Sequence, residues 1–364
     1  MVQLSTLLAG AAGLATIVSA HPGHDVKAEA AERAAAVKHI RARNVNACAD
    51  QLHARGVEAA NVARRDNMLK KIRKARGLDG PLLKARDTAP LNTSHHSDLA
   101  VDLNTDPSEL FASGGTCVLA EDVTQGPYYV TGEMIRDNLI EEQEGVDLYL
   151  DIQLLDSETC EPVPNVFLDF WHCNSTGVYS GIVANGNGDS SDETNLDSTF
   201  LRGLQQTDDA GVAQFHTLFP GHYTGRAPHI HVLSHPNGTT VNTNNDTISG
   251  LYTTSSSHVG QLFFDQDLIS LVEENEPYAS NTQELVLNED DSILLQELND
   301  NIDPFVEYVL LGDDVSQGLF SWVTIVVDSS QSTSVTPAAY YTENGGVENP
   351  NSGPGGGSGG PPPS

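Results

Sequence analysis

Residues 147–156, DLYLDIQLLD, show an alternation that decides the fold class. Every second position from Leu148 to Leu154 is Leu or Ile, so these side chains share one face of an extended chain. This pattern predicts a β-strand with one apolar face. Further strand candidates, separated by turns rich in Gly, Asn, Pro and Asp, are residues 166–171, 212–216, 229–234, 261–264 and 322–327. We therefore expect an all-β domain with a β-sandwich core, and one helix near residues 268–276.

The rest of the 364-residue chain differs in composition from this core. The first 20 residues are apolar and end in small residues, as in a secretory signal peptide. A region rich in Ala, Arg, Lys and Glu follows and predicts two or three helices, which form either a helical subdomain or a propeptide cut at Arg64-Arg65 or Lys70-Lys71. The last residues are rich in Gly and Pro and predict a disordered tail. The expected segments are the signal peptide 1–20, the basic helical segment 21–86, a linker 87–114, the β-sandwich domain 115–335 and the tail 336–364.

Secretion agrees with two further features of the sequence. Four N-x-Ser/Thr sequons fit a glycosylated extracellular protein, and they lie at Asn92, Asn174, Asn237 and Asn245. The four cysteines could pair in three ways, and the sequence does not choose among them. No two of them have C-x-x-C spacing, which argues against a thiolate metal site. We expect a secreted glycoprotein.

The charges are divided unevenly along the chain. The net charge is −32, yet residues 21–86 carry 15 Lys and Arg against 7 Asp and Glu. Residues 87–364 carry 43 Asp and Glu and only three cations, which are Arg136, Arg202 and Arg226. A domain this acidic repels phosphate groups, so we expect neither a nucleic-acid partner nor a membrane surface.

The sharpest local feature is the stretch from Arg226 to His231, RAPHIH. If it is a strand, His229 and His231 point to the same face, about 7 Å apart along the chain, and can converge on one metal ion. Two tyrosines accompany the pair: Tyr223 in the turn FPGHYTG just upstream, and Tyr179 in the segment WHCNSTGVYS.

These elements together resemble the intradiol ring-cleavage dioxygenases, and specifically their secreted fungal-type members. The segments WHCNSTGVYS, FPGHYTG and RAPHIH follow one another in the order of that family, and Gly126-Pro127-Tyr128 and Gln261 match two further elements. The likeness covers roughly residues 115–330. It implies one mononuclear non-haem Fe(III), completed by a solvent hydroxide, with O2 as co-substrate. The ligands it implies are Tyr179, Tyr223, His229 and His231.

The resemblance also implies roles for residues around the metal. Arg226 would stabilise negative charge on the bound catecholate, and Tyr223 would leave the metal and take a proton from the substrate. Gln261 would contact a substrate oxygen, and Pro127 and Tyr128 would line the pocket wall. The implied reaction opens a catechol-type ring between its two hydroxyl-bearing carbons and gives a muconate-type diacid. The family leaves His172 and His222 without a ligand role.

Charge sharpens the expected choice of substrate. A domain of net charge −40 with one arginine in its pocket should slow the approach of carboxylated catechols, so we expect a preference for neutral catechols or hydroxyquinol-like phenols. Two alternatives stay open at this stage. One is a non-enzymatic secreted β-sandwich for adhesion or carbohydrate binding, and the other is a copper or zinc enzyme that uses His21 and His24. The sequence leaves the physiological catechol and the oligomeric state undetermined.

Overall fold

The computed structural model describes residues 45–78, 111, 116–117, 126–236, 239, 255–299, 302–350 and 352. The expected signal peptide, His21 and His24 therefore lie outside the described residues, as does nearly all of the linker expected at 87–114. No helix in the described ranges is both long and apolar enough to cross a membrane.

The first sheet is built on the strand that the alternating leucines predict. β3 (Asp147–Asp156) has the expected bounds and pairs in parallel with β11 (Leu319–Val327) along the whole length of β11. β6 (Val212–Leu218) pairs antiparallel with the other edge of β3. The far edge of β11 is shared by β10 (Glu307–Leu310) and the short β1 (Thr116–Cys117), which pair with its first and second halves.

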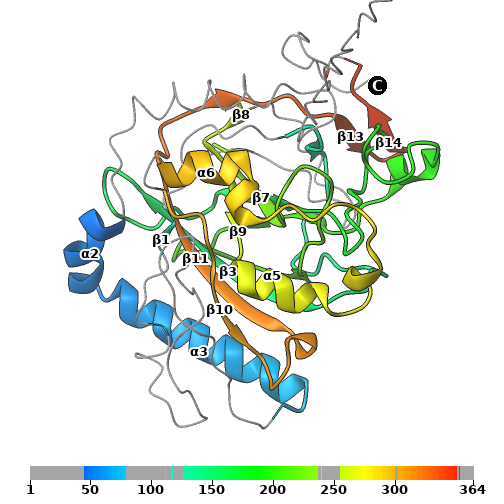
Figure 1. The fold of residues 1–364 in the computed structure, drawn as a ribbon. Coiled ribbons are helices and arrows are strands. Elements are labelled where there is room, and N and C mark those ends of the chain that lie inside the picture. Colours follow the sequence, from blue (N-terminus) through cyan, green and yellow to red (C-terminus); the bar gives the residue numbers. More distant parts are fainter. Residues whose placement is uncertain are drawn as a thin grey trace, which may run out of the picture.

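The second sheet has the order β5-β4-β7-β9, and its neighbouring strands are antiparallel. Its strands are β5 (Arg202–Gln206), β4 (Phe167–Trp171), β7 (His229–Ser234) and β9 (His258–Phe263). Its inner face meets the first sheet, as Figure 1 shows, and the alternating side chains of both sheets form one apolar core. Leu150 and Ile152 enter this core from one side and Phe170 and Val232 from the other. The expected β-sandwich is confirmed.

The outer face of the second sheet is covered by short elements. Trp171, Leu233 and Val259 pack there against β2 (Val130–Thr131) and its neighbours. The other elements at the rims are η2 (Glu193–Asp197), β8 (Ser255–Ser256), α5 (Gln266–Glu273), η3 (Tyr278–Ser280), η4 (Asn288–Asp290), α6 (Ser292–Asn299), η5 (Val315–Gln317) and β12 (Thr333–Ser334). Helix α5 agrees with the helix expected near residues 268–276, and α6 is an additional helix.

The expected tail begins later than residue 336. β13 (Ala339–Thr342) pairs in parallel with β2 and antiparallel with β14 (Gly345–Glu348), and Asn349 is buried. The boundary drawn at residue 335 is therefore wrong. Strand pairing uses backbone groups, which a composition rich in Gly and Asn does not remove. Residues 353–364 lie outside the description.

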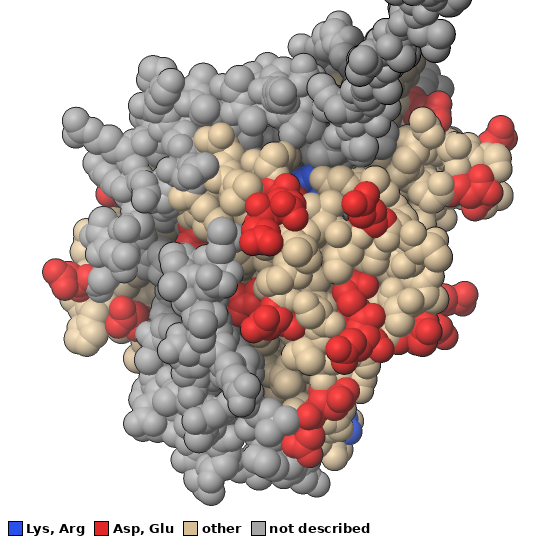
Figure 2. All heavy atoms as spheres, viewed as in Figure 1, with Lys and Arg blue, Asp and Glu red and all other residues tan. Residues whose placement is uncertain are grey.

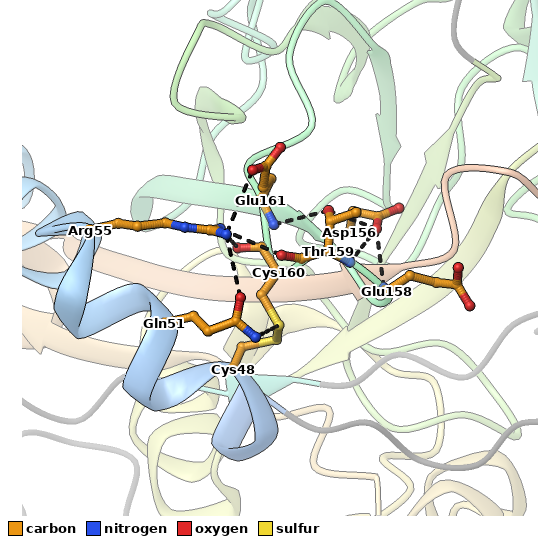
Figure 3. The surroundings of a disulfide bond; sticks show 8 residues. All are labelled: Cys48, Gln51, Arg55, Asp156, Glu158, Thr159, Cys160 and Glu161. Atoms are coloured by element: carbon orange, nitrogen blue, oxygen red, sulfur yellow. Dashed lines mark hydrogen bonds and ion pairs between the residues drawn. A yellow bond between two sulfur atoms is a disulfide. The ribbon is translucent and has the colours of Figure 1, made fainter.

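The basic segment folds onto the outer face of the first sheet. Helices α2 (Val45–Ala54) and α3 (Val57–Ala75) follow each other, and Leu69 and Ile72 pack against Trp322. A disulfide joins Cys48 to Cys160, and Figure 3 shows it tying α2 to the turn after β3. Nearby, Arg55 donates to the Cys160 carbonyl oxygen at 3.1 Å.

Three ion pairs reinforce this docking. Arg64 and Arg65 both contact the Asp151 carboxylate on β3, and Arg76 contacts Asp147. Arg65 is buried, so the doublet Arg64-Arg65 is not exposed to a protease in the folded chain. The other doublet, Lys70-Lys71, is exposed, so the helical subdomain and the propeptide both stay open.

The acidic character of the main domain is visible on its surface. Figure 2 shows Asp and Glu side chains scattered over the face in view, with very little Lys or Arg among them. Arg64 and Arg65 of α3, and Arg76 just after it, are instead directed at acidic side chains of the first sheet. The basic N-terminal segment and the acidic domain thus attract each other where α3 packs on β3.

Candidate metal and ring-cleavage site

The two histidines of β7 meet on the outer face of the second sheet. Strand alternation places His229 and His231 on the same side, both are buried, and their Nε2 atoms are 3.1 Å apart. His231 stacks on Trp171 with ring centroids 4.8 Å apart and an angle of 5° between planes. Trp171 is also the residue paired with His231 on β4, and Gln261 is the residue paired with it on β9. The expectation that this strand directs two imidazoles to one point holds geometrically.

The tautomer of His229 follows from its backbone partner. Its Nδ1 lies 2.7 Å from the carbonyl oxygen of Ala227, and a carbonyl oxygen can only accept, so Nδ1 carries the hydrogen. In the neutral ring, Nε2 then keeps its lone pair. This lone pair points to the space shared with His231 and with Tyr223, whose Oη is 3.4 Å away.

The two tyrosines complete a four-donor cluster. Ring centroids are 5.5 Å apart between Tyr179 and Tyr223, 5.7 Å between Tyr223 and His229, and 6.1 Å between Tyr179 and His231. Both tyrosines are buried. Four side chains from three separate stretches of sequence therefore surround one small volume.

Two glycines bring the tyrosine-bearing loops together. Gly177 lies at φ 80°, and a Cβ on it would collide with the carbonyl oxygen of His222. A Cβ on Gly221 would collide in turn with the carbonyls of Asn174 and Ser175. The two backbones are thus in direct contact, which only residues without a side chain allow. This contact sets the distance between Tyr179 and Tyr223.

Asparagine side chains hold the backbone of Tyr179 itself. Asn187 accepts from the Tyr179 nitrogen at 2.7 Å and donates to its carbonyl oxygen at 2.8 Å. Asn195 in η2 donates to the same oxygen at 2.9 Å. Within Asn174–Val178, the Asn174 side chain accepts from two backbone N–H groups and shapes the turn before Tyr179. These hydrogen bonds hold the loop on both sides of the Tyr179 peptide.

The histidines that the family leaves without a ligand role have structural partners. His172 contacts the Cys173 carbonyl oxygen and Thr217 Oγ1, both at 2.7 Å. His222 contacts Glu273 at 2.8 Å and the Gln283 carbonyl oxygen at 3.1 Å. Both rings are occupied by these contacts and do not point into the four-donor cluster.

The chemistry of the four donors fits a hard metal ion. Burial raises the pKa of both phenols, that of Tyr179 well above its ordinary value. Each phenol therefore keeps its proton unless a cation binds to the oxygen in the proton's place. Two phenolate oxygens and two imidazole nitrogens suit Fe(III). Among the described residues, no group of three or more His, Cys, Asp or Glu could hold a metal ion.

Arg226 is buried beside this cluster and is held on two sides. Its Nε donates to Asp291 Oδ2 at 2.8 Å, and its Nη2 donates to Gln261 Oε1 at 2.5 Å. Burial alone would lower the pKa of Arg226, but the Asp291 carboxylate outweighs burial and raises it, so the guanidinium is charged. Asp291 also accepts from the Ala227 nitrogen, so one carboxylate positions both Arg226 and the start of β7.

The residues expected to line the pocket or contact the substrate, Pro127, Tyr128 and Gln261, differ in how closely they approach the four-donor cluster. The Tyr128 ring is 4.7 Å from that of Tyr179 and 6.2 Å from that of Tyr223, so it lines the cluster as expected. Gln261 contacts Arg226, as described above, and its Nε2 has no hydrogen-bond partner among the described residues. Pro127 is only partly buried, between Tyr128 and Gly126. A Cβ on Gly126 would lie 3.2 Å from the His231 ring, so this turn approaches the cluster closely.

Comparison with known proteins agrees with this arrangement. Residues 124–297, which contain all four donors, match the family model described as Dioxygenase (Dioxygenase_C). Residues 124–297 therefore form a domain of the intradiol ring-cleavage dioxygenase family. It is an enzyme of ring cleavage, and the alternative of a non-enzymatic binding module is set aside.

Several solved structures are similar to this dioxygenase. An intradiol ring-cleavage dioxygenase from Tetranychus urticae is 28% identical, with a TM-score of 0.46 over 59% of this chain and 97% of that one. The dioxygenase domain of a carbohydrate-binding fusion protein from Streptomyces sp. SirexAA-E is 20% identical, with a TM-score of 0.33 over 58% and 98%. Catechol 1,2-dioxygenase from Acinetobacter sp. ADP1 is 17% identical, with a TM-score of 0.35 over 58% and 62%. No curated protein matches the chain.

Sequence reasoning missed several residues that shape the site of this dioxygenase. Asp291 lies 65 positions after Arg226, and only its place before an apolar run, typical of a helix N-cap, could have drawn attention to it. Asn187 and Asn195 lie in a polar loop that resembles any other turn. Arg202 carried no signal beyond being one of three cations in its domain.

Proposed function

We propose that this dioxygenase is an Fe(III)-dependent enzyme that opens catechol-type rings between the two hydroxyl-bearing carbons. The observation that carries the proposal is the position of His229 Nε2, which lies 3.1 Å from His231 Nε2 and 3.4 Å from Tyr223 Oη. The hydrogen bond from His229 Nδ1 to the Ala227 carbonyl oxygen leaves the Nε2 lone pair directed at these two groups. Tyr179 supplies the fourth donor.

The bound ion would supply Lewis acidity and a template that draws electron density from the diol. The overall reaction balances without an outside reductant: one carbon–carbon bond breaks and both atoms of O2 enter the product, which gives two carboxyl groups of a muconate-type diacid. The protein must therefore bind the diol, take up its protons and exclude competing water.

Tyr223 is suited to take a proton from the diol. Its hydroxyl is next to His229 Nε2, and its backbone forms an isolated bridge with Arg226. A phenolate at this position would recover its preferred protonated form by accepting a proton at Oη, because burial favours the neutral phenol. The guanidinium of Arg226, although paired with Asp291, would then lie beside the negative charge that develops on the substrate ring.

The aromatic wall supports a flat, apolar substrate. Tyr128 packs against Tyr179 and Tyr223, and Trp171 lies behind His231. Gln261 and Arg226 provide the polar contacts opposite this wall. A few polar groups in an otherwise aromatic lining suit a catechol-type phenol.

Secretion is part of the proposal. The Cys48–Cys160 disulfide supports it, because disulfides persist in oxidising compartments. N-terminal sequencing of protein recovered from the culture medium should find a chain that starts after Ala20. Protein retained in the cells with residues 1–20 intact would count against secretion.

The decisive experiment is the visible spectrum of purified protein together with its iron content. Ferric tyrosinate gives a red to burgundy colour by charge transfer from phenolate to iron, and catechol added without O2 should shift the band. Tyr179→Phe should remove most of the band, whereas Tyr340→Phe, on β13, should leave it unchanged. O2 uptake with catechol should match diacid formation one to one.

Two results would contradict the proposal. One is a colourless protein that takes up no iron and still cleaves catechol. The other is an iron band that Tyr179→Phe and His231→Ala both leave intact.

A further inference from the structure

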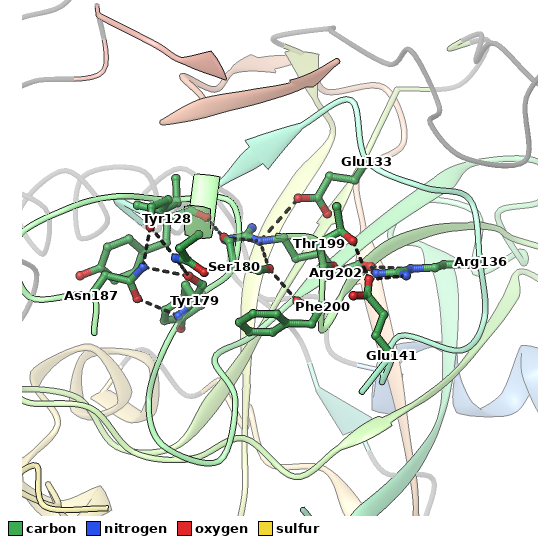
Figure 4. A network of polar contacts seen from close by, with 12 residues as sticks. Tyr128, Glu133, Arg136, Glu141, Tyr179, Ser180, Asn187, Thr199, Phe200 and Arg202 are labelled. Atoms are coloured by element: carbon green, nitrogen blue, oxygen red, sulfur yellow. Dashed lines mark hydrogen bonds and ion pairs between the residues drawn. The ribbon is translucent and has the colours of Figure 1, made fainter. Parts of the chain in front are cut away.

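Arg202 is a buried cation behind the tyrosine wall. It is 1% exposed and begins β5, and Figure 4 shows its guanidinium reaching toward the loops of Tyr128 and Tyr179. Its Nη2 donates to the Tyr128 carbonyl oxygen at 2.7 Å. Its Nε donates to the Ser180 carbonyl oxygen at 3.0 Å and to Ser180 Oγ at 3.1 Å.

These contacts join the two loops that face each other across the site. Ser180 directly follows Tyr179, and the rings of Tyr128 and Tyr179 are 4.7 Å apart. The guanidinium carbon of Arg202 also lies 5.9 Å from the centroid of the Tyr179 ring, in a cation–π arrangement. One side chain therefore joins both loops and brings a positive charge to the face of one ring.

Stability alone gives little reason for a charge at this place. The nearest carboxylate, Glu133, is also buried and is 3.5 Å from Arg202 Nε, so the ion pair is loose. Buried ion pairs often contribute no more than apolar residues of similar volume. The planar fork of an arginine, in contrast, binds two separate carbonyls from different nitrogens in a fixed geometry, which the single nitrogen of lysine does not reproduce and methionine lacks.

We propose that Arg202 is a positioning residue of the ring-cleavage site, which holds Tyr128 and Tyr179 at their mutual distance and places a positive charge on the face of the Tyr179 ring. This inference rests on the proposed function, since it takes Tyr179 to be an iron ligand. Arg202 does not touch the reacting atoms and acts through the two tyrosines.

The test compares three variants of the full chain. Arg202→Met removes both the charge and the planar guanidinium, whereas Arg202→Lys keeps the charge but loses the guanidinium. Arg136→Lys is the matched control, because Arg136 lies in the same network, donates to the carbonyls of Arg202 and Thr199, and pairs with Glu141. Figure 4 shows Arg136 on the far side of Arg202 from the tyrosines.

We expect Arg202→Met to shift the iron–phenolate band to longer wavelength, because the cation lowers the energy of the phenolate donor orbital. The kcat should fall at least about tenfold in both Arg202 variants, since small displacements of reacting groups are costly. Arg136→Lys should keep the band position and keep kcat/KM within about twofold.

A second measurement does not depend on iron. In crystals of metal-free Arg202→Lys, chosen because it is the milder change, the Tyr128 and Tyr179 rings should lie farther apart than 4.7 Å. Unchanged ring separation, band and kcat in the Arg202 variants would overturn the inference. A wild-type protein without an iron band would instead overturn the proposed function, and the ring separation would still test the role of Arg202.

Discussion

The carboxylate of Asp291 lies 2.8 Å from Nε of Arg226, and both side chains are completely buried. The same carboxylate accepts from the backbone nitrogens of Ile293 and Leu294 and so caps helix α6. It also accepts from the nitrogen of Ala227, two residues before His229. Arg226, helix α6 and the start of the histidine strand thus share one anchor, and the charge of Arg226 is paired with a carboxylate within the protein.

Asp291→Asn separates these roles, because asparagine still caps a helix but no longer balances a charge. We expect kcat/KM with catechol to fall at least about tenfold, because the buried guanidinium loses its anchor. The loss for the carboxylated catechol protocatechuate should be smaller, since the freed charge can attract its carboxylate. The control is Asp290→Asn, because Asp290 is the preceding residue, is exposed and carries the same charge. This variant should keep the wild-type kcat/KM for both catechol and protocatechuate. Equal losses for both substrates would contradict the idea that Asp291 balances Arg226.

The sequence was informative wherever local pattern sufficed. Alternation predicted β3 and β7 to the residue, and the ordered motifs located Tyr179 and the histidines. It failed where function depends on contacts between distant segments. The pairing of Arg226 with Asp291 is formed by a helix that docks from far along the chain, and the glycine-rich C-terminal region is ordered by pairing with β2. Neither composition nor periodicity encodes such contacts.

The acidic surface and the balanced Arg226 both favour neutral substrates. We predict that kcat/KM for catechol exceeds that for protocatechuate by at least about tenfold at low salt, since fields of this kind alter association rates by such factors. The ratio should fall as ionic strength rises to about 0.3 M, where charges are screened within a few ångströms. The measurement is steady-state O2 uptake at both ionic strengths. Equal or greater kcat/KM for protocatechuate at low ionic strength would refute the prediction.

The close contact of the two tyrosine loops can be tested at Gly177. Gly177→Ala places a methyl group against the His222 carbonyl at positive φ, so we expect a loss of at least about 3 kcal/mol in the free energy of unfolding and a weakened iron band. Gly56→Ala is the control, because Gly56 has a similar φ of 69° but open space around it. It should lose only about 1 kcal/mol. Similar losses in urea denaturation would show that the backbone conformation alone, and not the contact between the loops, requires the glycine.

The docking of α3 should make the fold sensitive to acid. Burial would raise the pKa of Asp151, but Arg64 and Arg65 outweigh it and hold the pKa below its ordinary value. The ion pairs therefore stabilise the fold above about pH 4, the unfolded pKa, and this contribution is lost as pH falls through the lower folded pKa. Asp151→Asn should cost about 3 kcal/mol at pH 6 and flatten this dependence in urea melts between pH 6 and pH 2.5. Asp66→Asn, in an exposed pair with Lys70, should cost less than about 1 kcal/mol. An unchanged acid profile in Asp151→Asn would contradict this role.

The C-terminal hairpin should support the tyrosine wall. The Ala338 nitrogen donates to the Tyr129 carbonyl oxygen at 2.7 Å, β13 pairs with β2, and Gly346 donates to Asp197 in η2, next to the residues that hold Tyr179. Removal of residues 337–364 should therefore lower Tm by at least about 5 °C and raise KM for catechol, because an apolar strand and its hydrogen bonds are lost. Removal of residues 353–364 alone should leave Tm and KM unchanged. The check is a thermal melt and steady-state kinetics of both truncated chains, and wild-type KM after the longer truncation would exclude the hairpin from any role in the site.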